Sequence, residues 1–238
     1  MTHLWVRAEQ RENEDRVGLT PDGARKLIEK GIHVSVENSR SRIVPIADYA
    51  DAGCDIVGEN TWPDAPNSAI IFGLKELPED GTPLIHRHIM FGHAFKGQHS
   101  SKALLRRFQA GGGTLYDLEY LTDAKGRRVA AFGYWAGYAG AAVSFIAWLA
   151  QQRGETCGPV SAYPNKDALL RDLHDAMEGV SASPNAIVIG ALGRVGTGAA
   201  DLCDNLNIPV TKWDIAETAT GGPFPEVLDH TFFFNCIL

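Results

Sequence analysis

Residues 186–206 read AIVIGALGRVGTGAADLCDNL, and this stretch decides the fold class. Its apolar start predicts a buried strand, GALGRVG predicts a tight turn, and the remainder predicts a helix. Gly193 and Gly196 hold the last two places of a G-x-G-x-x-G pattern, with Ala191 at its first place and Gly190 just before. Glycine at these places lets the backbone approach a pyrophosphate, which binds to N–H groups at the helix N-terminus.

A carboxylate follows the next predicted strand of this unit. The strand is VTKW, residues 210–213, and Asp214 comes directly after it. A carboxylate about twenty residues beyond the glycine turn can accept hydrogen bonds from the adenosine ribose hydroxyls. It would also repel a 2′-phosphate, which favours NAD over NADP. A glycine turn alone also occurs with no ligand, but the order of strand, turn, helix, strand and acid favours dinucleotide binding.

The rest of the chain alternates predicted strands with predicted helices. Thr20 and Pro21 predict the start of a helix that runs to Gly31, because Thr caps a helix and Pro suits its first position. The other predicted helices are residues 47–53, 101–110 and 167–180, and the predicted strands are residues 3–9, 33–38, 54–58, 69–75, 88–95, 114–121, 127–133 and 231–238. Such alternation predicts an α/β fold with a mostly parallel sheet.

Composition restricts the function and the compartment. The 238 residues carry a net charge of −7, which disfavours a nucleic-acid partner because phosphates bind to positive surfaces. Four separated cysteines without a CxxC pair, and an N-terminus without a signal-peptide pattern, favour a cytoplasmic protein. Residues 129–150 carry no charge and could span a bilayer. Because they are rich in Gly and Ala, we interpret them as a helix buried on every side, and we expect no membrane partner.

Charged side chains follow several apolar runs. Lys75, Glu76, His93 and Glu119 each come after a predicted strand, and ligands of α/β sheets bind beyond the carboxyl ends of strands. Taken singly, Lys75 and Glu76 also fit a solvated strand exit, and His93 fits a core histidine. A zinc site from His93 and the two histidines of HRH has no evident fourth ligand and is disfavoured. These patterns alone indicate an NAD-dependent α/β enzyme.

A resemblance to a known family makes the function more specific. RAEQRENEDRVGLTPDGARKLIEKG is similar to the N-terminal signature of the alanine dehydrogenase and saccharopine dehydrogenase superfamily. GLKELPED, TLYDLEYLTDAKGRRVAAFGYWAGYAGAA, IGALGRVGTGA and KWDIAETATGGPFPE resemble the lysine-forming, NAD-dependent saccharopine dehydrogenases. The resemblance covers essentially the whole chain. It implies two Rossmann-like parallel-sheet domains with a cleft between them, the second incomplete. We expect a substrate domain at residues 1–133, a long apolar helix and linker at residues 134–184, and the start of an NAD-binding domain at residues 185–238.

The resemblance also implies a reaction of lysine metabolism and its site residues. NAD oxidises saccharopine, and hydrolysis of the imine gives L-lysine and 2-oxoglutarate. On the family's pattern His93 handles the amine proton, Lys75 serves the hydrolytic steps, and Glu76 and Glu119 tune both electrostatically. The expected ligands of substrate carboxylates are Arg16 and Arg128, with Arg127 less certain because a solvated hairpin end is the alternative. The expected cofactor-binding residues are Gly190, Gly193, Arg194, Val195, Gly196 and Asp214.

The resemblance carries three further expectations. The family continues for roughly another hundred residues, so we expect this chain to be truncated, with its final apolar strand facing nothing. A small-molecule substrate (saccharopine, or lysine plus 2-oxoglutarate) and a monomer are expected. The alternatives are an alanine dehydrogenase-like amino-acid dehydrogenase and an inactive, truncated NAD-binding remnant.

Overall fold

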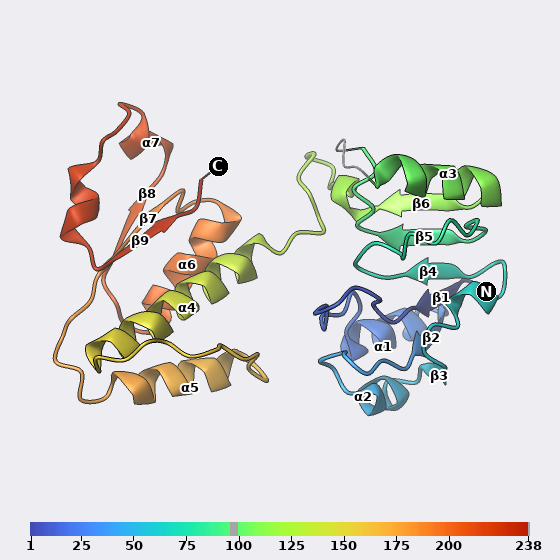
Figure 1. Cartoon of the computed structure of the whole chain (residues 1–238), viewed down its shortest axis with the longest axis horizontal. Helices are drawn as coiled ribbons and strands as arrows, with labels where there is room; N and C mark the ends of the chain where they lie inside the picture. The colour runs from blue at the N-terminus through green and yellow to red at the C-terminus, as the bar shows by residue number, and fades with distance from the viewer. Residues whose placement is uncertain (96–99, 238) are drawn as a thin grey trace. The chain divides into compact units, whose positions relative to one another are not determined.

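The computed structural model describes residues 1–95 and 100–237 and divides the chain into two compact units. Unit 1 comprises Met1–Ala130, and unit 2 comprises Ala131–Leu238. Each unit has its own parallel sheet and its own hydrophobic core (Figure 1). The predicted α/β class is confirmed in both.

Unit 1 is built on a six-stranded sheet in the order β3-β2-β1-β4-β5-β6, and all of its neighbouring strands are parallel. Its strands are β1 (His3–Val6), β2 (His33–Glu37), β3 (Asp55–Val57), β4 (Ile70–Phe72), β5 (Arg87–Met90) and β6 (Thr114–Asp117). The strand order reverses between β1 and β4. In open α/β sheets, ligands bind beyond the carboxyl ends of the strands at such a reversal.

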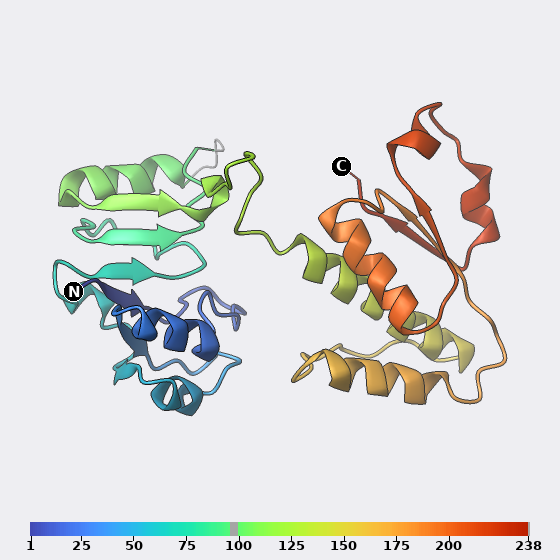
Figure 2. The same cartoon turned by 180° about the vertical axis from the view of Figure 1, so that it is seen from behind.

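Within the described residues, three α-helices connect these strands, namely α1 (Pro21–Glu29), α2 (Ile46–Asp51) and α3 (Ser101–Gly111). In the view of Figure 2, α1 lies in front of the sheet of unit 1. The predicted cap of α1 is confirmed, because the Thr20 hydroxyl accepts a hydrogen bond of 3.2 Å from the backbone N–H of Gly23. Gly112 caps the C-terminus of α3 and adopts a left-handed conformation (φ 73°) that glycine reaches without strain.

A buried carboxylate ties the end of β2 to its neighbours. Glu37 is fully buried and accepts four hydrogen bonds, two on each carboxylate oxygen. The donors are Trp5 Nε1 (3.0 Å) and the backbone N–H groups of Ala8 (2.8 Å), Asn60 (3.1 Å) and Trp62 (2.5 Å). Strand β2 lies between β1 and β3, and Val34 to Glu37 are all buried.

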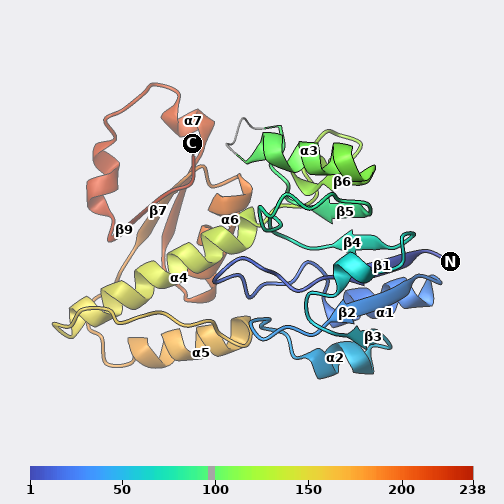
Figure 3. The same cartoon turned by 45° about the vertical axis from the view of Figure 1, so that its right-hand side comes forward.

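Unit 2 has a three-stranded parallel sheet in the order β8-β7-β9. The elements of unit 2 are α4 (Gly133–Gln152), α5 (Lys166–Met177), β7 (Ala186–Ile189), α6 (Arg194–Asn205), β8 (Val210–Trp213), α7 (Ile215–Thr218), the 3₁₀ turn η3 (Pro225–Asp229) and β9 (Phe232–Asn235). Helix α4 runs alongside α6 (Figure 3). Their approach needs glycine, because a Cβ on Gly198 would overlap the carbonyl oxygen of Tyr134, and one on Gly137 would overlap that of Val195.

The interpretation of residues 129–150 as a helix buried on every side is wrong. Helix α4 buries one face, including Tyr138, Phe145 and Leu149, while Trp135 and Val143 on the other face are 56% and 44% exposed. Gly137 on the buried face allows α6 to approach closely, which accounts for the small residue there. Among the residues that the structure describes, no helix is long and apolar enough to cross a membrane.

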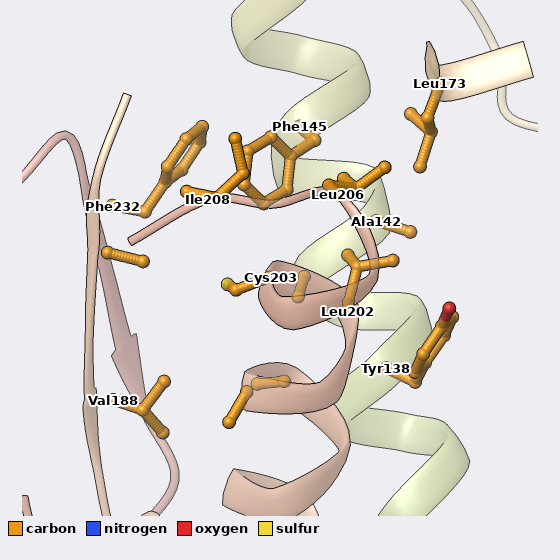
Figure 4. Close-up of a cluster of buried hydrophobic side chains, with 14 of the residues drawn as sticks. Tyr138, Ala142, Phe145, Leu173, Val188, Leu202, Cys203, Leu206, Ile208 and Phe232 are labelled. Atoms are coloured by element: carbon orange, nitrogen blue, oxygen red, sulfur yellow. The ribbon is translucent and has the colours of Figure 1, made fainter. Parts of the chain in front are cut away.

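The final strand has a partner, which corrects the expectation that it faces nothing. β9 pairs with β7, and the Phe232 ring lies 4.2 Å from that of Phe145 and 5.8 Å from that of Trp148. Figure 4 shows Phe232 beside Phe145 in the core between the strands and helices α4 and α6. In the described part of the chain, no strand pairs with the outer edge of β9.

A second correction concerns residues 127–133, which were predicted to form a strand. Only an isolated bridge between Thr122 and Arg128 forms there. The Asp123 carboxylate closes this loop by accepting hydrogen bonds of 2.9 Å from the backbone N–H groups of Lys125 and Arg127. A turn stabilised in this way needs no ladder of strand hydrogen bonds.

Candidate active site

The carboxyl edge of the unit 1 sheet gathers the residues expected to carry the chemistry. Lys75 and Glu76 follow β4, His93 follows β5, and Glu119 follows β6. His93 lies between two carboxylates: its Nδ1 is 3.8 Å from Glu119 Oε2, and its Nε2 is 4.0 Å from Glu76 Oε1. The Glu119 side chain is buried, whereas those of Glu76 and His93 are partly exposed. An imidazole with a carboxylate at each nitrogen can hold or release a proton at this edge.

Two buried side chains from the end of β1 hold the backbone of Lys75. The Glu9 carboxylate accepts hydrogen bonds from the backbone N–H groups of Leu74 (2.6 Å) and Lys75 (3.0 Å). Arg7 donates to the carbonyl oxygen of Lys75 and pairs with Glu9 at 3.4 Å. Burial lowers the pKa of Arg7, and the neighbouring glutamates oppose this effect. Sequence reasoning missed both residues, although they stand in the RAEQ segment of the N-terminal signature.

Another carboxylate, that of Asp117, holds the backbone on both sides of His93. It accepts hydrogen bonds from the N–H groups of Gly92 (3.2 Å, Oδ1) and Ala94 (3.3 Å, Oδ2). It also accepts one from the N–H of Glu119 (3.0 Å, Oδ1). His93 has φ 48°, a left-handed conformation that side chains other than glycine rarely adopt. Nothing in the sequence pattern singled out Asp117.

The two arginines expected to bind carboxylates are each held by a buried glutamate. Glu14 accepts 2.7 Å and 2.6 Å hydrogen bonds from Nε and Nη2 of Arg16. Glu119 lies 2.9 Å from Nη1 and 3.0 Å from Nη2 of Arg128. Each arginine side chain remains about half exposed, at 52% and 43%. The bonds from Arg16 hold the pKa of Glu14 below its ordinary value, and the Lys75 ammonium lowers it further. Lys75 and Arg16 therefore both act on the Glu14 carboxylate.

Arg127, unlike Arg16 and Arg128, is not held by a buried glutamate in the contacts of its loop. Its guanidinium pairs with Asp123 at 3.0 Å on the exposed loop, and its side chain is 69% exposed. This geometry fits the solvated hairpin end that the sequence left open as an alternative.

The two histidines of HRH, which the disfavoured zinc site would need, are buried in the core. His86 makes a 3.0 Å hydrogen bond with the carbonyl oxygen of Ala65, and His88 packs edge-on against Trp62 and Phe108 in the core. Within residues 1–95 and 100–237, no group of three or more His, Cys, Asp or Glu side chains could hold a metal ion.

The glycine loop of unit 2 has the backbone that close approach of a pyrophosphate requires. Gly190 has φ 85°, and a Cβ on Gly196 would overlap the carbonyl oxygen of Gly190. Gly193 is the cap residue of α6, so Arg194 and Val195 form its first turn, which contains no acidic residue. The loop lies at the end of β7, between the two strands that flank it, where the strand order reverses. These features fit a dinucleotide phosphate at the helix N-terminus.

Asp214 links this loop to the next helix. Its Oδ2 accepts a 2.9 Å hydrogen bond from the N–H of Leu192, and its Oδ1 accepts one of 2.9 Å from the N–H of Ile215. Glu217 completes a capping box, because its Oε2 accepts a 2.7 Å hydrogen bond from the N–H of Asp214. The carboxylate is therefore fixed beside the glycine loop, as a ribose ligand must be.

Comparisons with known proteins agree with this geometry. Residues 5–139 match the family described as alanine dehydrogenase/PNT, N-terminal domain. The chain is 48% identical to the NAD(+), L-lysine-forming saccharopine dehydrogenase of Yarrowia lipolytica, over 98% of this chain and 66% of that protein. It is 44% identical to the enzyme of the same name from Candida albicans, over 98% of this chain and 67% of that protein.

A solved structure shows the same fold at lower identity. The transhydrogenase from Sinorhizobium meliloti superposes with a TM-score of 0.62 at 18% identity, over 97% of this chain and 63% of that chain. The chain spans about two thirds of the length of the two saccharopine dehydrogenases. By sequence and by fold, it belongs to the alanine dehydrogenase/PNT N-terminal-domain family and, within it, to the NAD(+), L-lysine-forming saccharopine dehydrogenases.

Proposed function

We propose that this chain supplies the catalytic groups and the adenosine half of the cofactor site of an enzyme that oxidises saccharopine with NAD. The products are L-lysine and 2-oxoglutarate. The observation that carries the proposal is the placement of His93 between Glu76 and Glu119, on the same sheet edge as Lys75. Saccharopine dehydrogenases that are 43–48% identical to this chain support the same reaction.

The acid and base steps fall to His93 and Lys75. Saccharopine is a secondary amine that joins the side-chain nitrogen of lysine to the glutamate skeleton. His93 takes the amine proton as the C=N bond forms, and Lys75 moves protons while water adds and the C–N bond breaks. NAD, when bound, supplies the chemistry of accepting the hydride from the substrate carbon. Glu76 and Glu119 stabilise the charge that His93 gains.

Substrate orientation falls to Arg16 and Arg128. A buried glutamate holds the guanidinium of each, and about half of each side chain stays exposed. A planar guanidinium fixed in this way can present N–H groups to a substrate carboxylate without losing much side-chain entropy. Saccharopine has several carboxylates, whereas alanine has one, so two such arginines favour the larger substrate.

The first test replaces Lys75 with Met. In protein extended to the full length of its relatives, Lys75→Met should lower kcat for saccharopine by about 10²-fold or more, the usual scale for a general acid/base. NAD affinity should stay unchanged, because Lys75 belongs to unit 1 and the glycine loop to unit 2. Lys125→Met, on the exposed loop, is the matched control and should have normal turnover. Normal turnover in Lys75→Met would show that Lys75 is only a solvated strand exit.

Two further measurements test the substrate and the cofactor. Initial rates with saccharopine and with alanine, each with NAD, separate the proposed reaction from that of an alanine dehydrogenase-like enzyme, and faster turnover of alanine would overturn the proposal. Asp214→Ser should narrow the preference for NAD over NADP, because the carboxylate that repels a 2′-phosphate is removed. Glu217→Gln shares the capping box but should keep the preference. Equal affinity for both cofactors in the unaltered protein would contradict this role of Asp214.

A further inference from the structure

We infer that Asp117 is a positioning residue that sets the geometry of His93 and Glu119 together. The inference rests on the proposed function for its catalytic consequence but not for its structural content. Asp117 accepts hydrogen bonds from the backbone that carries these two side chains.

The hydrogen bonds of Asp117 bracket His93 in the chain. One carboxylate oxygen accepts from the residue before His93, and the other accepts from the residue after it, at 3.2 Å and 3.3 Å. His93 itself has the unfavourable φ of 48°. Such a conformation persists only where the surroundings hold it, and two bonds from one rigid carboxylate are a direct means of holding it. The ring of His93 is thereby aimed at the space between Glu76 and Glu119.

The same carboxylate places the second partner. Asp117 Oδ1 also accepts the N–H of Glu119 at 3.0 Å, so Asp117 is the cap residue of the 3₁₀ turn η2 (Leu118–Tyr120). Glu119 in turn pairs with Arg128 at 2.9 Å and lies 3.8 Å from His93 Nδ1. One side chain at the end of β6 thus joins β5 and β6 and sets the His93–Glu119 distance.

Space beside His93 supports this role. A Cβ on Gly92 would lie 2.9 Å from Leu115 Cδ2 and 3.5 Å from Asp117 Oδ2. The segment therefore lies close against β6, where the short reach of an aspartate suffices. A glutamate at position 117 would push the carboxylate into the same space. Asparagine keeps the shape but offers one acceptor oxygen, so its amide N–H₂ faces at least one backbone N–H.

The first arm of the test uses the 238-residue chain and needs no turnover. Backbone NMR of the unaltered chain should show the strong intraresidue Hα–HN contact of a left-handed residue at His93. The amide protons of Gly92, Ala94 and Glu119, which share this one acceptor carboxylate, should all be protected from exchange with solvent. In Asp117→Asn, the left-handed signature of His93 should weaken and the signals of His93 and Glu119 should both move, while the amides of β1 and β2 stay in place.

Asp123→Asn is the matched control, because Asp123 also accepts backbone N–H bonds in a nearby loop but none from the His93 segment. It should leave His93 unchanged. Unchanged signals of His93 and Glu119 in Asp117→Asn would overturn the inference. Where the variant does not fold, the unaltered chain still decides, because amide protons of Gly92, Ala94 and Glu119 that exchange with solvent as fast as those of an open loop would equally overturn it.

The second arm measures turnover in protein of the relatives' full length. Asp117→Asn should lower kcat by about 10²-fold and change KM little, because a misplacement of about 1 Å affects the transition state more than binding. A loss confined to KM would contradict positioning of His93. Failure of the unaltered protein to oxidise saccharopine would refute the proposed function alone, since the NMR arm still decides the role of Asp117.

Discussion

His88 makes the stability of unit 1 dependent on pH. Its side chain is 1% exposed, and its ring lies 5.2 Å from that of Trp62 and 5.4 Å from that of Phe108. Within the described residues, its Nε2 has no hydrogen-bond partner. Burial lowers the pKa of His88 to about 3 from an ordinary 6.5, and the charges of Arg7, His86 and Arg107 act in the same direction.

The sign follows from which state binds the proton. The unfolded chain protonates His88 near pH 6.5, but the folded chain does not until about pH 3. This contribution to stability is therefore fully present above pH 6.5 and is lost as the pH falls toward 3. The fully developed loss corresponds to about 5 kcal/mol, and the loss at pH 5 to about 2 kcal/mol.

Replacing His88 with Phe should remove this dependence and keep a planar ring in the core. Urea unfolding, followed through the NMR signals of β5 and β6, gives the free energy of unfolding of unit 1 at pH 7 and pH 5. Between these values the unaltered chain should lose about 2 kcal/mol more than His88→Phe. Each protein is compared with itself, so a packing cost of the larger ring cancels. His174→Gln, at an exposed position of α5, should behave as the unaltered chain. Equal losses in the unaltered chain and in His88→Phe would refute the reasoning.

Two further predictions concern buried groups, one in each unit. Glu37→Gln should lower the free energy of unfolding of unit 1 by about 2–6 kcal/mol, because either orientation of the amide leaves two of four buried N–H groups facing an N–H₂; Glu59→Gln, a partly exposed control, should cost little in the same urea titration. Gly198→Ala should destabilise unit 2 by about 1–3 kcal/mol or more, because the added methyl group would overlap the backbone of α4. Its control, Gly140→Ala in α4, meets nothing within 4 Å and should stabilise the helix by about 1 kcal/mol, so equal thermal shifts in the two variants would contradict the close approach.

Local signals predicted the elements that depend on local chemistry. The Thr20–Pro21 start of α1 and the strand–turn–helix at residues 186–205 were readable because caps and glycine turns satisfy nearby backbone groups. The prediction of a strand at residues 127–133 was wrong because a short apolar run is typical of a strand whether or not a partner strand lies beside it. The apolar helix α4 misled for a related reason, since small residues serve a close contact on one face as well as full burial.

The gathering of charged side chains at one edge of the sheet was predictable from their places after strands. The carboxyl ends of parallel strands meet at one edge, so a charged residue after each of β4, β5 and β6 had to converge with the others. The order of the strands in the sheet could not be read in this way. Neither could the left-handed conformation of His93, which depends on Asp117 from another strand.

The carboxylates that sequence reasoning missed share one property. Glu9, Glu14 and Asp117 hold something else in place: the backbone of Lys75, the guanidinium of Arg16 and the backbone around His93. A local pattern cannot distinguish such a carboxylate from a solvated one, because its partners come from other strands or from a folded loop. The distinction is physical, since a carboxylate that accepts several N–H bonds fixes the groups around it, whereas a solvated one fixes nothing. The N-terminal signature therefore includes two residues, Glu9 and Glu14, that hold the backbone of Lys75 and the guanidinium of Arg16 in place.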